Sequence, residues 1–277
     1  MERFAKIIPV YRPATFVYKE GIFLARLKFM NTEVDNLTME EALEQMDVLI
    51  NERNNAYVVT PNVDHLIQLE RGGELVEAYR QANLILTDGK PLIWISKWYG
   101  TPIKEKISGS DLFPKLCAMA AEKGYKMFFL GAAEGVAAKA AENLKIRYPG
   151  LQIVGTYSPP VGFENNPKEI EGIRNMILDT SPDILILALG TPKQELYILH
   201  HRESLGVPLS LGLGASLDFE AGNVRRAPKW MADHGLEWLF RITQDPKRLA
   251  KRYLVDDMKI FSLALKYRKN KSLSSRS

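Results

Sequence analysis

The segment Asp183–Gly190, DILILALG, contains the strongest strand candidate of the chain, Ile184–Leu189. Its apolar run is short and does not alternate with polar residues, which is typical of a strand buried on both faces of a sheet. Helical patterns flank such runs, notably over 110–123, 134–147, 168–180 and 192–204. This alternation predicts an α/β fold: a mainly parallel sheet with helices on both faces, in a Rossmann-like arrangement. The other strand candidates, each bounded by Gly, Pro, Asn or Asp, are Tyr57–Thr60, Leu84–Thr87, Met127–Leu130, Ile153–Thr156 and Leu209–Leu211.

The order of these patterns divides the chain into four parts. Residues 1–26 form an N-terminal extension, with strand candidates at Phe16–Tyr18 and Ile22–Leu27. Residues 27–222 form the α/β core, which begins with a helix over 39–53 because Thr38 and Glu41 match a capping box. The Lys- and Ser-rich end, 269–277, is expected to be disordered. Between core and end, residues 223–268 form an α-helical appendage with helices at Arg226–Asp233, Leu236–Thr243, Pro246–Tyr253 and Asp256–Tyr267.

Charge is distributed unevenly along the 277 residues. The whole chain has 37 Lys and Arg against 33 Asp and Glu, a net charge of +4. Residues 223–277 hold 14 basic and 5 acidic residues, so this part carries +9 and the rest −5. In the last helix, Met258, Phe261 and Leu265 form an apolar stripe beside basic residues. The appendage is therefore expected to dock on an anionic membrane surface.

The composition also indicates a compartment. No window approaches the run of about 18 apolar residues that a membrane-spanning helix requires. Charged residues and Pro13 interrupt the N-terminus, which lacks the pattern of a signal peptide. The single cysteine, Cys117, lies in a helix-like run and cannot form an intramolecular disulfide. We therefore expect a cytoplasmic protein with a buried thiol.

Polar residues leave the strand candidate Tyr57–Thr60 at the kind of edge where open α/β sheets bind ligands. Thr60, Asn62 and Asp64 suit hydrogen bonding to a ribose, a base or a sugar. The alternative is that Asn62 or Asp64 merely caps the following helix, and taken alone this alternative is favoured. His65, in the first turn of that helix, is expected to have a structural role.

Asp88 follows a second strand candidate, within Thr87-Asp-Gly-Lys-Pro91. Its carboxylate is a candidate general base, and Gly89 allows the backbone to turn sharply or to approach a ligand. An ordinary Asp-Gly turn, with Pro91 opening a helix, explains the same residues equally well. Two strands that end in polar loops, where a ligand site is expected, favour the functional interpretation.

A glycine turn follows the strand candidate Met127–Leu130. Gly131 opens a turn that can present backbone N–H groups and a helix N-terminus to a diphosphate. The segment lacks the full G-x-G-x-x-G spacing, and no acidic residue follows a later strand to hold a ribose. An NAD site is therefore disfavoured.

The segment Leu189–Glu195 follows the strongest strand candidate. Gly190 and Thr191 are candidate phosphate contacts, and Gln194 is a candidate partner for uracil or sugar. An N-cap at Thr191 with Pro192 at the first helical position explains the Thr-Pro pair equally well, but it does not explain Gln194 or Glu195. Further on, the glycine-rich stretch 212–222 is either a loop around a ligand's phosphates or a hinge to the appendage.

Several signatures are absent from the sequence. It has no Asp-x-Asp pair, no Walker A loop, no His/Cys cluster with metal spacing and no Gly-x-Ser-x-Gly elbow. A Mg²⁺-dependent transferase built around paired aspartates is therefore disfavoured, and we expect no metal and no cofactor.

Seven ordered segments, spanning about Leu27 to Tyr253, resemble the WecG/TagA/CpsF family of bacterial glycosyltransferases, also called glycosyltransferase family 26. They are TPNVDH, LTDGKP, SGSDL, FFLGAAEGVA, LALGTPKQE, GLGASLDFEAG and RRAPKWMADHGLEWLFRITQDPKRLAKRY. The resemblance implies an inverting, metal-independent transferase that moves a sugar from a UDP-sugar to a polyprenyl-diphosphate-linked saccharide, at the inner face of the bacterial membrane. Members build teichoic acid linkage units, enterobacterial common antigen or exopolysaccharide, so the implied sugar is N-acetylmannosamine, its uronic acid or glucose.

The resemblance also implies residue roles. The proposed base of the family falls on Asp88, and its T-x-N motif falls on Thr60 and Asn62. The Gln of its P-x-Q-E motif falls on Gln194. The family often has Arg shortly before the GSDL segment, where this chain has Lys106, which keeps the charge but not the bidentate fork. The basic residues implied to close over the diphosphate are Arg241, Arg248 and Lys251 or Arg252.

Two other functions stay open from the residues alone. A nucleotide-sugar epimerase or dehydrogenase would need a tightly bound dinucleotide. A non-enzymatic membrane-surface adaptor would use the basic appendage but would leave the strand-end residues without a purpose. No nucleic acid is expected as a partner. A homo-oligomer is a further candidate, because displacing an appendage exposes apolar surface that self-association would cover.

Overall fold

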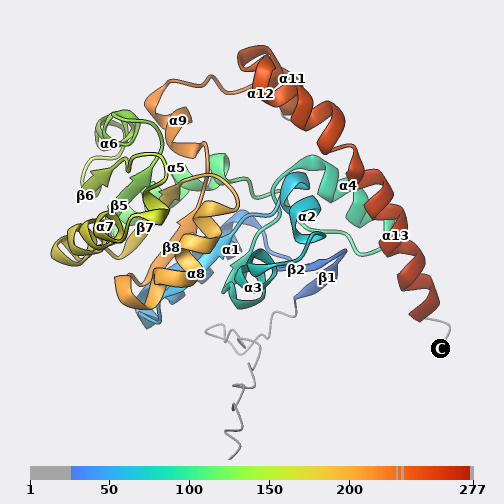
Figure 1. Ribbon diagram of the computed structural model, residues 1–277, viewed down its shortest axis with the longest axis horizontal. Coiled ribbons are helices and arrows are strands. Elements are labelled where there is room, and N and C mark those ends of the chain that lie inside the picture. Colours follow the sequence, from blue (N-terminus) through green and yellow to red (C-terminus); the bar gives the residue numbers. More distant parts are fainter. Residues whose placement is uncertain (1–25, 229, 232–233, 275–277) are drawn as a thin grey trace, which may run out of the picture.

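A six-stranded sheet forms the centre of the molecule (Figure 1). In this computed structural model, residues 26–228, 230–231 and 234–274 are described. The strand order is β4-β3-β8-β7-β5-β6, and every neighbouring pair is parallel. The six predicted core strands are therefore confirmed. Their bounds are β3 Ala56–Val59, β4 Leu84–Ile85, β5 Lys126–Gly131, β6 Gln152–Tyr157, β7 Ile184–Ala188 and β8 Leu209–Gly212.

Helices cover both faces of the sheet, as the Rossmann-like prediction requires. One face packs against α1 (Met39–Glu52), α5 (Gly109–Lys123), α6 (Val136–Arg147) and α9 (Ser216–Ala221). The other packs against α2 (Val63–Leu69), α3 (Glu74–Gln81), α4 (Lys90–Trp98), α7 (Pro167–Thr180) and α8 (Lys193–Leu205). A short 3₁₀ turn, η1 (Phe163–Asn165), precedes α7.

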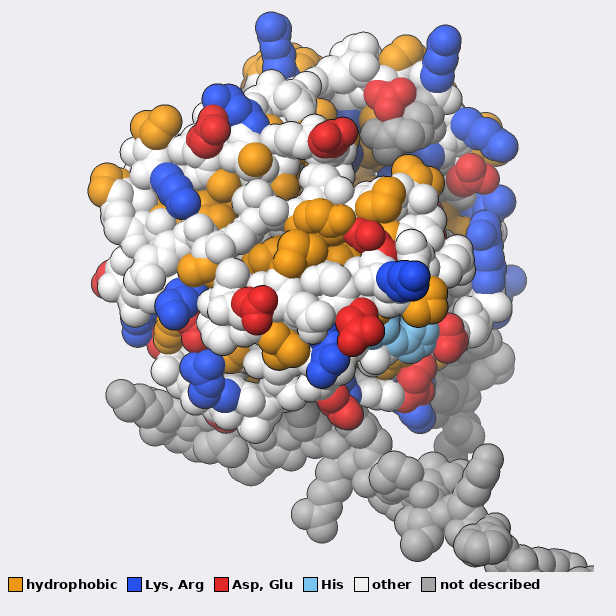
Figure 2. Space-filling model, turned by 60° about the vertical axis from the view of Figure 1, so that its left-hand side comes forward, with side chains coloured by type: hydrophobic (Ala, Val, Ile, Leu, Met, Phe, Trp, Pro, Cys, Tyr) orange, Lys and Arg blue, Asp and Glu red, His pale blue; other side chains and the backbone are white. Residues whose placement is uncertain are grey.

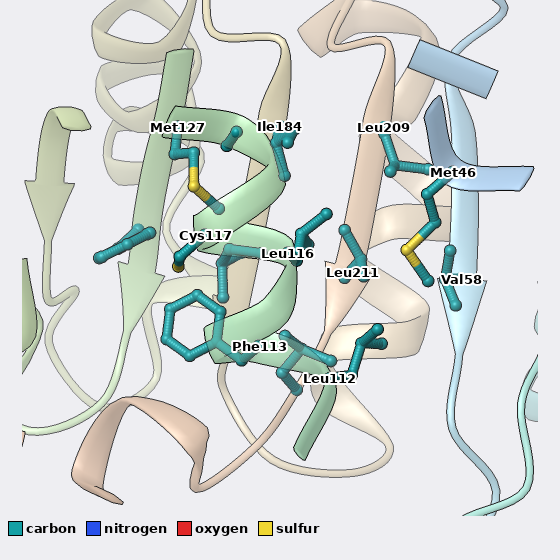
Figure 3. Close-up of a cluster of buried hydrophobic side chains, with 14 of the residues drawn as sticks. Met46, Val58, Leu112, Phe113, Leu116, Cys117, Met127, Ile184, Leu209 and Leu211 are labelled. Carbon is teal, nitrogen blue, oxygen red and sulfur yellow. The ribbon is translucent and has the colours of Figure 1, made fainter. Parts of the chain in front are cut away.

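Strand β7 shows why the apolar runs do not alternate with polar residues. Ile184 and Ile186 belong to the core on the α5 side of the sheet, whereas Leu185 and Leu187 belong to the core on the α8 side. Successive side chains of a strand point to opposite faces, so a strand covered on both faces needs apolar residues throughout. Figure 3 shows the first core, where α5 lies across β5, β7 and β8. Cys117 is buried there, and this burial raises the pKa of its thiol.

Local signals set the first elements. The Thr38 hydroxyl accepts a hydrogen bond from the Glu41 N–H at 3.2 Å, and the Glu41 carboxylate accepts one from the Thr38 N–H at 2.7 Å. This capping box opens α1 where the sequence predicts it. Before it, β1 (Leu27–Phe29) and β2 (Thr32–Val34) form an antiparallel hairpin that the sequence patterns did not indicate. The strand candidate Phe16–Tyr18 lies outside the described residues, and of Ile22–Leu27 only the end is described.

The appendage is helical, with boundaries that differ from the prediction. It contains α11 (Glu237–Gln244), α12 (Pro246–Lys251), a π-helical turn η2 (Arg252–Asp256) and α13 (Lys259–Ser274). Residues 226–228 are not helical, and the rest of the helix expected at Arg226–Asp233 falls partly outside the described residues. The helix expected to reach Tyr253 ends at Lys251, where the π-helical turn begins. The last helix continues to Ser274, into the end that was expected to be disordered.

Helix α13 lies against the core beside α4 (Figure 1). Its inner side chains Ile260, Leu263 and Ala264 are buried in the core on the α2 side, and the Tyr99 hydroxyl donates to the Ala264 carbonyl at 2.5 Å. The predicted stripe faces outward, since Phe261 is 60% exposed and Leu265 is 52% exposed. The helix therefore has two apolar sides, of which only one packs against the protein.

On the face that Figure 2 turns forward, a group of apolar side chains lies near the centre, and basic and acidic side chains are scattered around it. Within the described part of the chain, no helix is both long and apolar enough to span a bilayer.

Candidate active site

The two polar loops singled out in the sequence lie side by side at the carboxyl edge of the sheet. Strands β3 and β4 pair through Val59 and Ile85, and the pairing continues past the strands, since the Asp88 N–H donates to the Pro61 carbonyl at 2.8 Å. On its other side, the Thr87 carbonyl accepts from the Ile107 N–H at 2.8 Å. These backbone bonds hold together the TPN segment, the TDG segment and Ile107, the residue that precedes the SGSDL segment.

Asp88 has an unusual electrostatic environment. Its carboxyl group is half-buried, and desolvation raises its pKa to about 7. The charges of Lys106 and Arg241 lower this pKa, while the carboxylates of Glu237 and Asp111 raise it. A carboxyl group with a pKa near neutral pH is matched to accepting a proton from a hydroxyl group. The carboxyl group at this edge therefore has the pKa that a general base needs.

Lys106 and Asp111 form an ion pair, and the charges of both act on Asp88. The Lys106 ammonium lies 2.8 Å from an Asp111 carboxylate oxygen, and the Ser108 hydroxyl donates to the same oxygen at 2.6 Å. Burial lowers the pKa of Lys106, but the hydrogen bond and charge of Asp111 outweigh this effect and raise it. Lys106 is therefore a fixed positive charge at the site, held in place by α5.

The same Asp111 connects the core to the appendage. Its other carboxylate oxygen lies 3.2 Å from the Arg226 guanidinium, which also donates to the Ser110 carbonyl. The guanidinium of Arg241, on α11, lies 5.9 Å from the ring centroid of Phe219 on α9. The appendage thus brings a second cation, Arg241, to the region of Asp88.

Thr60 and Asn62 lie in the loop between β3 and α2. Thr60 is buried, and the Asn62 side chain accepts a hydrogen bond from the His65 N–H at 3.3 Å. The capping alternative for Asn62 is therefore confirmed. The cap engages only the side-chain carbonyl oxygen of Asn62, so capping and ligand contact are compatible.

The loop after β7 differs from the capping alternative considered for Thr191. Helix α8 begins at Lys193, its N-cap position is Pro192, and no side chain caps it. The Thr191 hydroxyl instead lies 2.5 Å from the His65 ring, and it donates to Glu195 at 3.3 Å. A capping role for Thr191 is therefore wrong, because a partner 126 positions away engages its hydroxyl.

Gln194 and Glu195 are buried below this loop. They are 2% and 1% exposed, and the Gln194 amide donates to Glu195 at 2.9 Å. The Gln194 carbonyl oxygen accepts from the Gly214 N–H at 3.1 Å. Burial raises the pKa of Glu195 to about 7, although the Gln194 hydrogen bond lowers it. Both side chains therefore engage protein groups on the loops after β7 and β8.

Glycine occupies the two candidate positions, 131 and 190, for different local reasons. Gly131 has φ +112°, and a Cβ there would lie 2.6 Å from the Ala188 carbonyl oxygen, so close packing of β5 against β7 requires glycine. Gly190 is exposed, has φ +75°, and a Cβ there would contact nothing. Backbone conformation therefore restricts both positions, and only Gly190 leaves open space beside the chain.

The implied basic residues of the appendage are not gathered at one point. Arg252 lies 3.3 Å from Asp64 on α2, whereas Lys251 is exposed at the end of α12. Arg248 lies on α12, and its side chain is outside the described part. Arg241 is the one whose charge acts on Asp88.

Sequence reasoning did not single out Asp111, Glu237, Tyr79 or Tyr253 as site residues. Asp111 belongs to a Ser-x-x-Asp pattern, which signals a helix start, and Ser108 caps α5 through the Asp111 N–H. Glu237 and Tyr253 reach Asp88 only through the folding of the appendage, which no local pattern indicates.

A carboxyl group with a near-neutral pKa, two cations whose charges act on it and glycine turns at the same edge suit a group-transfer enzyme on a Rossmann-like sheet. Residues 27–274 match the model of the family described as "Glycosyl transferase WecG/TagA/CpsF family". The chain belongs to this family, and it is a glycosyltransferase.

Similar proteins from three bacteria match most of the chain. A protein of Bacillus spizizenii (strain W23) is 31% identical over 80% of this chain and 83% of its own length. One of Bacillus subtilis (strain 168) is 29% identical over 72% of this chain and 75% of its own. One of Staphylococcus aureus (strain MW2) is 27% identical over 82% of this chain and 88% of its own length. All three are named N-acetylglucosaminyldiphosphoundecaprenol N-acetyl-beta-D-mannosaminyltransferase.

Proposed function

We propose that this glycosyltransferase moves an N-acetylmannosaminyl group from UDP to an N-acetylglucosamine carried on a polyprenyl diphosphate. The donor sugar and acceptor follow the names of the relatives. The observation that carries the proposal is the Asp88 carboxyl group, with a pKa of about 7, in the field of Lys106 and Arg241. The product belongs to cell-surface polysaccharide synthesis, as in teichoic acid linkage units.

The proposed chemistry is a single inverting displacement. Asp88 accepts the proton of the acceptor hydroxyl group. At the same time, the oxygen of that hydroxyl group forms a bond to the anomeric carbon of the donor sugar. The bond from that carbon to the diphosphate oxygen breaks on the opposite face, and the electron pair leaves with UDP. A positioned base contributes about 10²–10⁴-fold to such a step.

Positive charge is needed where the UDP leaving group becomes more negative. Lys106 and Arg241 are the cations whose charges act at Asp88, and Arg252 and Arg248 lie on the adjoining helical segments. The sequence has no Asp-x-Asp pair to bind a divalent ion with the diphosphate, so we propose that these side chains supply the charge. Activity that persists in EDTA supports this assignment, whereas activity restored only by Mg²⁺ contradicts it.

The donor contacts that we propose are Thr60 and Asn62 from the loop after β3, and Gly190 and Thr191 from the loop after β7. Gly131 provides the turn after β5, the strand on the other side of β7. The loops after the strands of a parallel sheet meet at one edge, and β8 separates β3 from β7, which leaves room for a nucleotide with a sugar attached.

We further propose that the protein works as a peripheral protein on the inner face of the bacterial membrane. The outward side of the appendage joins exposed apolar residues to basic ones, and the Arg268 guanidinium stacks over the exposed Trp98 ring at 4.2 Å. Lys251, Lys259 and Lys269 are exposed along the same segment. On such a surface, the burial of apolar side chains and the attraction of basic side chains to anionic lipid both strengthen membrane binding.

The decisive experiment offers the purified protein a panel of UDP-sugars with a short-chain lipid-diphosphate N-acetylglucosamine acceptor. We expect transfer from UDP-N-acetylmannosamine in preference to its uronic acid and to UDP-glucose. Transfer from another sugar would overturn the proposed donor but not the class, and no transfer from any of them would overturn the proposed reaction.

A further inference from the structure

A continuous series of buried polar side chains crosses the protein below the candidate site. The Tyr79 hydroxyl on α3 lies 2.5 Å from Nδ1 of His65 on α2, and Nε2 of His65 lies 2.5 Å from the Thr191 hydroxyl. The Thr191 hydroxyl donates to Oε1 of Glu195 at 3.3 Å. Tyr79, His65 and Glu195 are 2%, 5% and 1% exposed. The series joins three separate elements to the loop after β7.

The hydrogen bonds of this series have one direction. Burial lowers the pKa of His65 to about 4, so its ring is neutral, with one nitrogen donating and the other accepting. Because the Thr191 proton goes to Glu195, its oxygen accepts from Nε2–H of His65. Nδ1 of His65 then accepts from the Tyr79 hydroxyl. Every donor therefore points toward Glu195.

Glu195 joins this series to the next loop. Its Oε1 also accepts from the Gln194 amide, and the Gln194 carbonyl oxygen accepts from the Gly214 N–H after β8. Gln194 lies so close to β8 that a Cβ on Gly212 would be 2.8 Å from its amide nitrogen. The loops after β7 and β8 are thus fixed to each other and, through His65, to α2 and α3.

A purely structural core would not favour this arrangement. Apolar side chains can fill the same volume without a cost for burying polar groups, whereas Oε2 of Glu195 is buried with no partner among the described residues. Such under-satisfied buried groups cluster at functional sites, where orientation matters more than stability. Within this network, Thr191 is partly exposed and lies beside the open Gly190.

We propose that Tyr79, His65 and Glu195 are positioning residues that hold Thr191 and the loops after β7 and β8 in the orientation that binds the nucleotide-sugar donor. This inference rests on the proposed function. It assigns Glu195 and Gln194 to orienting the loops instead of touching the substrate.

The test compares two isosteric substitutions of buried tyrosines. Tyr79→Phe removes the first donor of the series, whereas Tyr197→Phe removes a buried hydroxyl that has no partner among the described residues. We expect Tyr79→Phe to raise the donor KM about 10-fold and to leave the acceptor KM within about twofold, because misplaced contacts weaken one substrate. Tyr197→Phe should change neither constant. A general loss of folded enzyme would lower kcat and leave both KM values unchanged, which would overturn the proposal.

A second pair of variants tests the end of the series. Glu195→Gln keeps an acceptor oxygen for Thr191 and Gln194, whereas Glu195→Leu keeps only the approximate volume. We expect the donor KM of Glu195→Gln to stay within about threefold of the wild type and that of Glu195→Leu to rise more than about 10-fold. Equal donor KM values in the two variants would contradict the positioning role.

Nitrogen-15 NMR of the His65 ring checks the direction of the hydrogen bonds in this series without an activity assay. The proposal requires the Nε2–H form of a neutral ring at pH 7, and an Nδ1–H form would overturn it. A wild-type protein that transfers no sugar would contradict the proposed function together with this inference. An active wild type with an unchanged Tyr79→Phe variant would contradict this inference alone.

Discussion

The guanidinium of Arg252 lies 3.3 Å from the carboxylate of Asp64, which ties the π-helical turn of the appendage to the first turn of α2. Both side chains are partly exposed, at 30% and 25%, so this ion pair contributes about 0–1 kcal/mol to stability. The buried side chains of α13 contribute more to holding the appendage. We therefore propose that Arg252 exchanges Asp64 for the diphosphate of a substrate at little cost.

Replacing Arg252 separates these two roles. We expect Arg252→Ala to lower kcat/KM at least about 10-fold, since a cation at the diphosphate is lost, and to lower the free energy of unfolding by about 1 kcal/mol or less. Asp64→Asn breaks the same ion pair but keeps the cation, so it should retain most of the activity. Equal losses in the two variants would show that the ion pair, and not the cation, is what matters.

The rate of transfer should depend on pH through Asp88. Desolvation raises the pKa of this group to about 7, and the base must be deprotonated, so kcat/KM should rise with pH and level off above about pH 8. Glu195 has a similar pKa, so the profile of Glu195→Gln shows which group controls the rate. An unchanged inflection in that variant supports Asp88, and its disappearance contradicts the assignment.

Asp88 should also lower the stability of the protein. Its folded pKa is raised, so the stability cost of ionising it grows as pH rises from about 4 to about 7 and is complete above that. Asp88→Asn should therefore raise the free energy of unfolding at pH 8, on the order of 1–3 kcal/mol, and less at pH 5.

Asp111→Asn is the control for this effect. The hydrogen bonds and charges around Asp111 lower its pKa in spite of burial, so its removal should destabilise the protein at pH 8. Thermal unfolding at pH 5 and at pH 8 shows whether each variant is more or less stable than the wild type. A lower Tm for Asp88→Asn at pH 8 would contradict the environment described for this carboxyl group.

The outward side of α13 should bind anionic lipid. Phe261→Ser with Leu265→Ser should abolish co-sedimentation with phosphatidylglycerol vesicles and leave Tm nearly unchanged, because both side chains are more than half exposed. Val161→Ser, at a fully exposed position after β6, is the matched control and should bind like the wild type. Equal binding by all three proteins would overturn the proposed membrane surface.

Much of the core could be predicted from local patterns. The strand β7 and the capped helix α1 have strong signals in a few consecutive residues, and both appear where the sequence predicts them. The short helices α3 and α9 and the β1–β2 hairpin were not predicted, because their residues lack a sustained period or a clear start signal.

The site was predictable only in part for a related reason. Asp88 lies three residues after the end of β4 at Ile85, so the strand pattern was enough to predict its position at the sheet edge. The partners that set its pKa, Glu237 and Arg241, come from an appendage whose placement depends on contacts such as that of Arg226 with Asp111, 115 positions apart. Thr191 shows the same limit, since the local Thr-Pro pattern suggested a cap and a distant histidine decides its role.

The most direct test of the central claim compares wild-type protein with Asp88→Asn in transfer from UDP-N-acetylmannosamine to a lipid-diphosphate N-acetylglucosamine. The account predicts that the wild type transfers the sugar, and that the variant stays folded, still binds UDP and loses at least about 100-fold in kcat. A folded variant that turns over at close to the wild-type rate would contradict the assignment of Asp88 as the base.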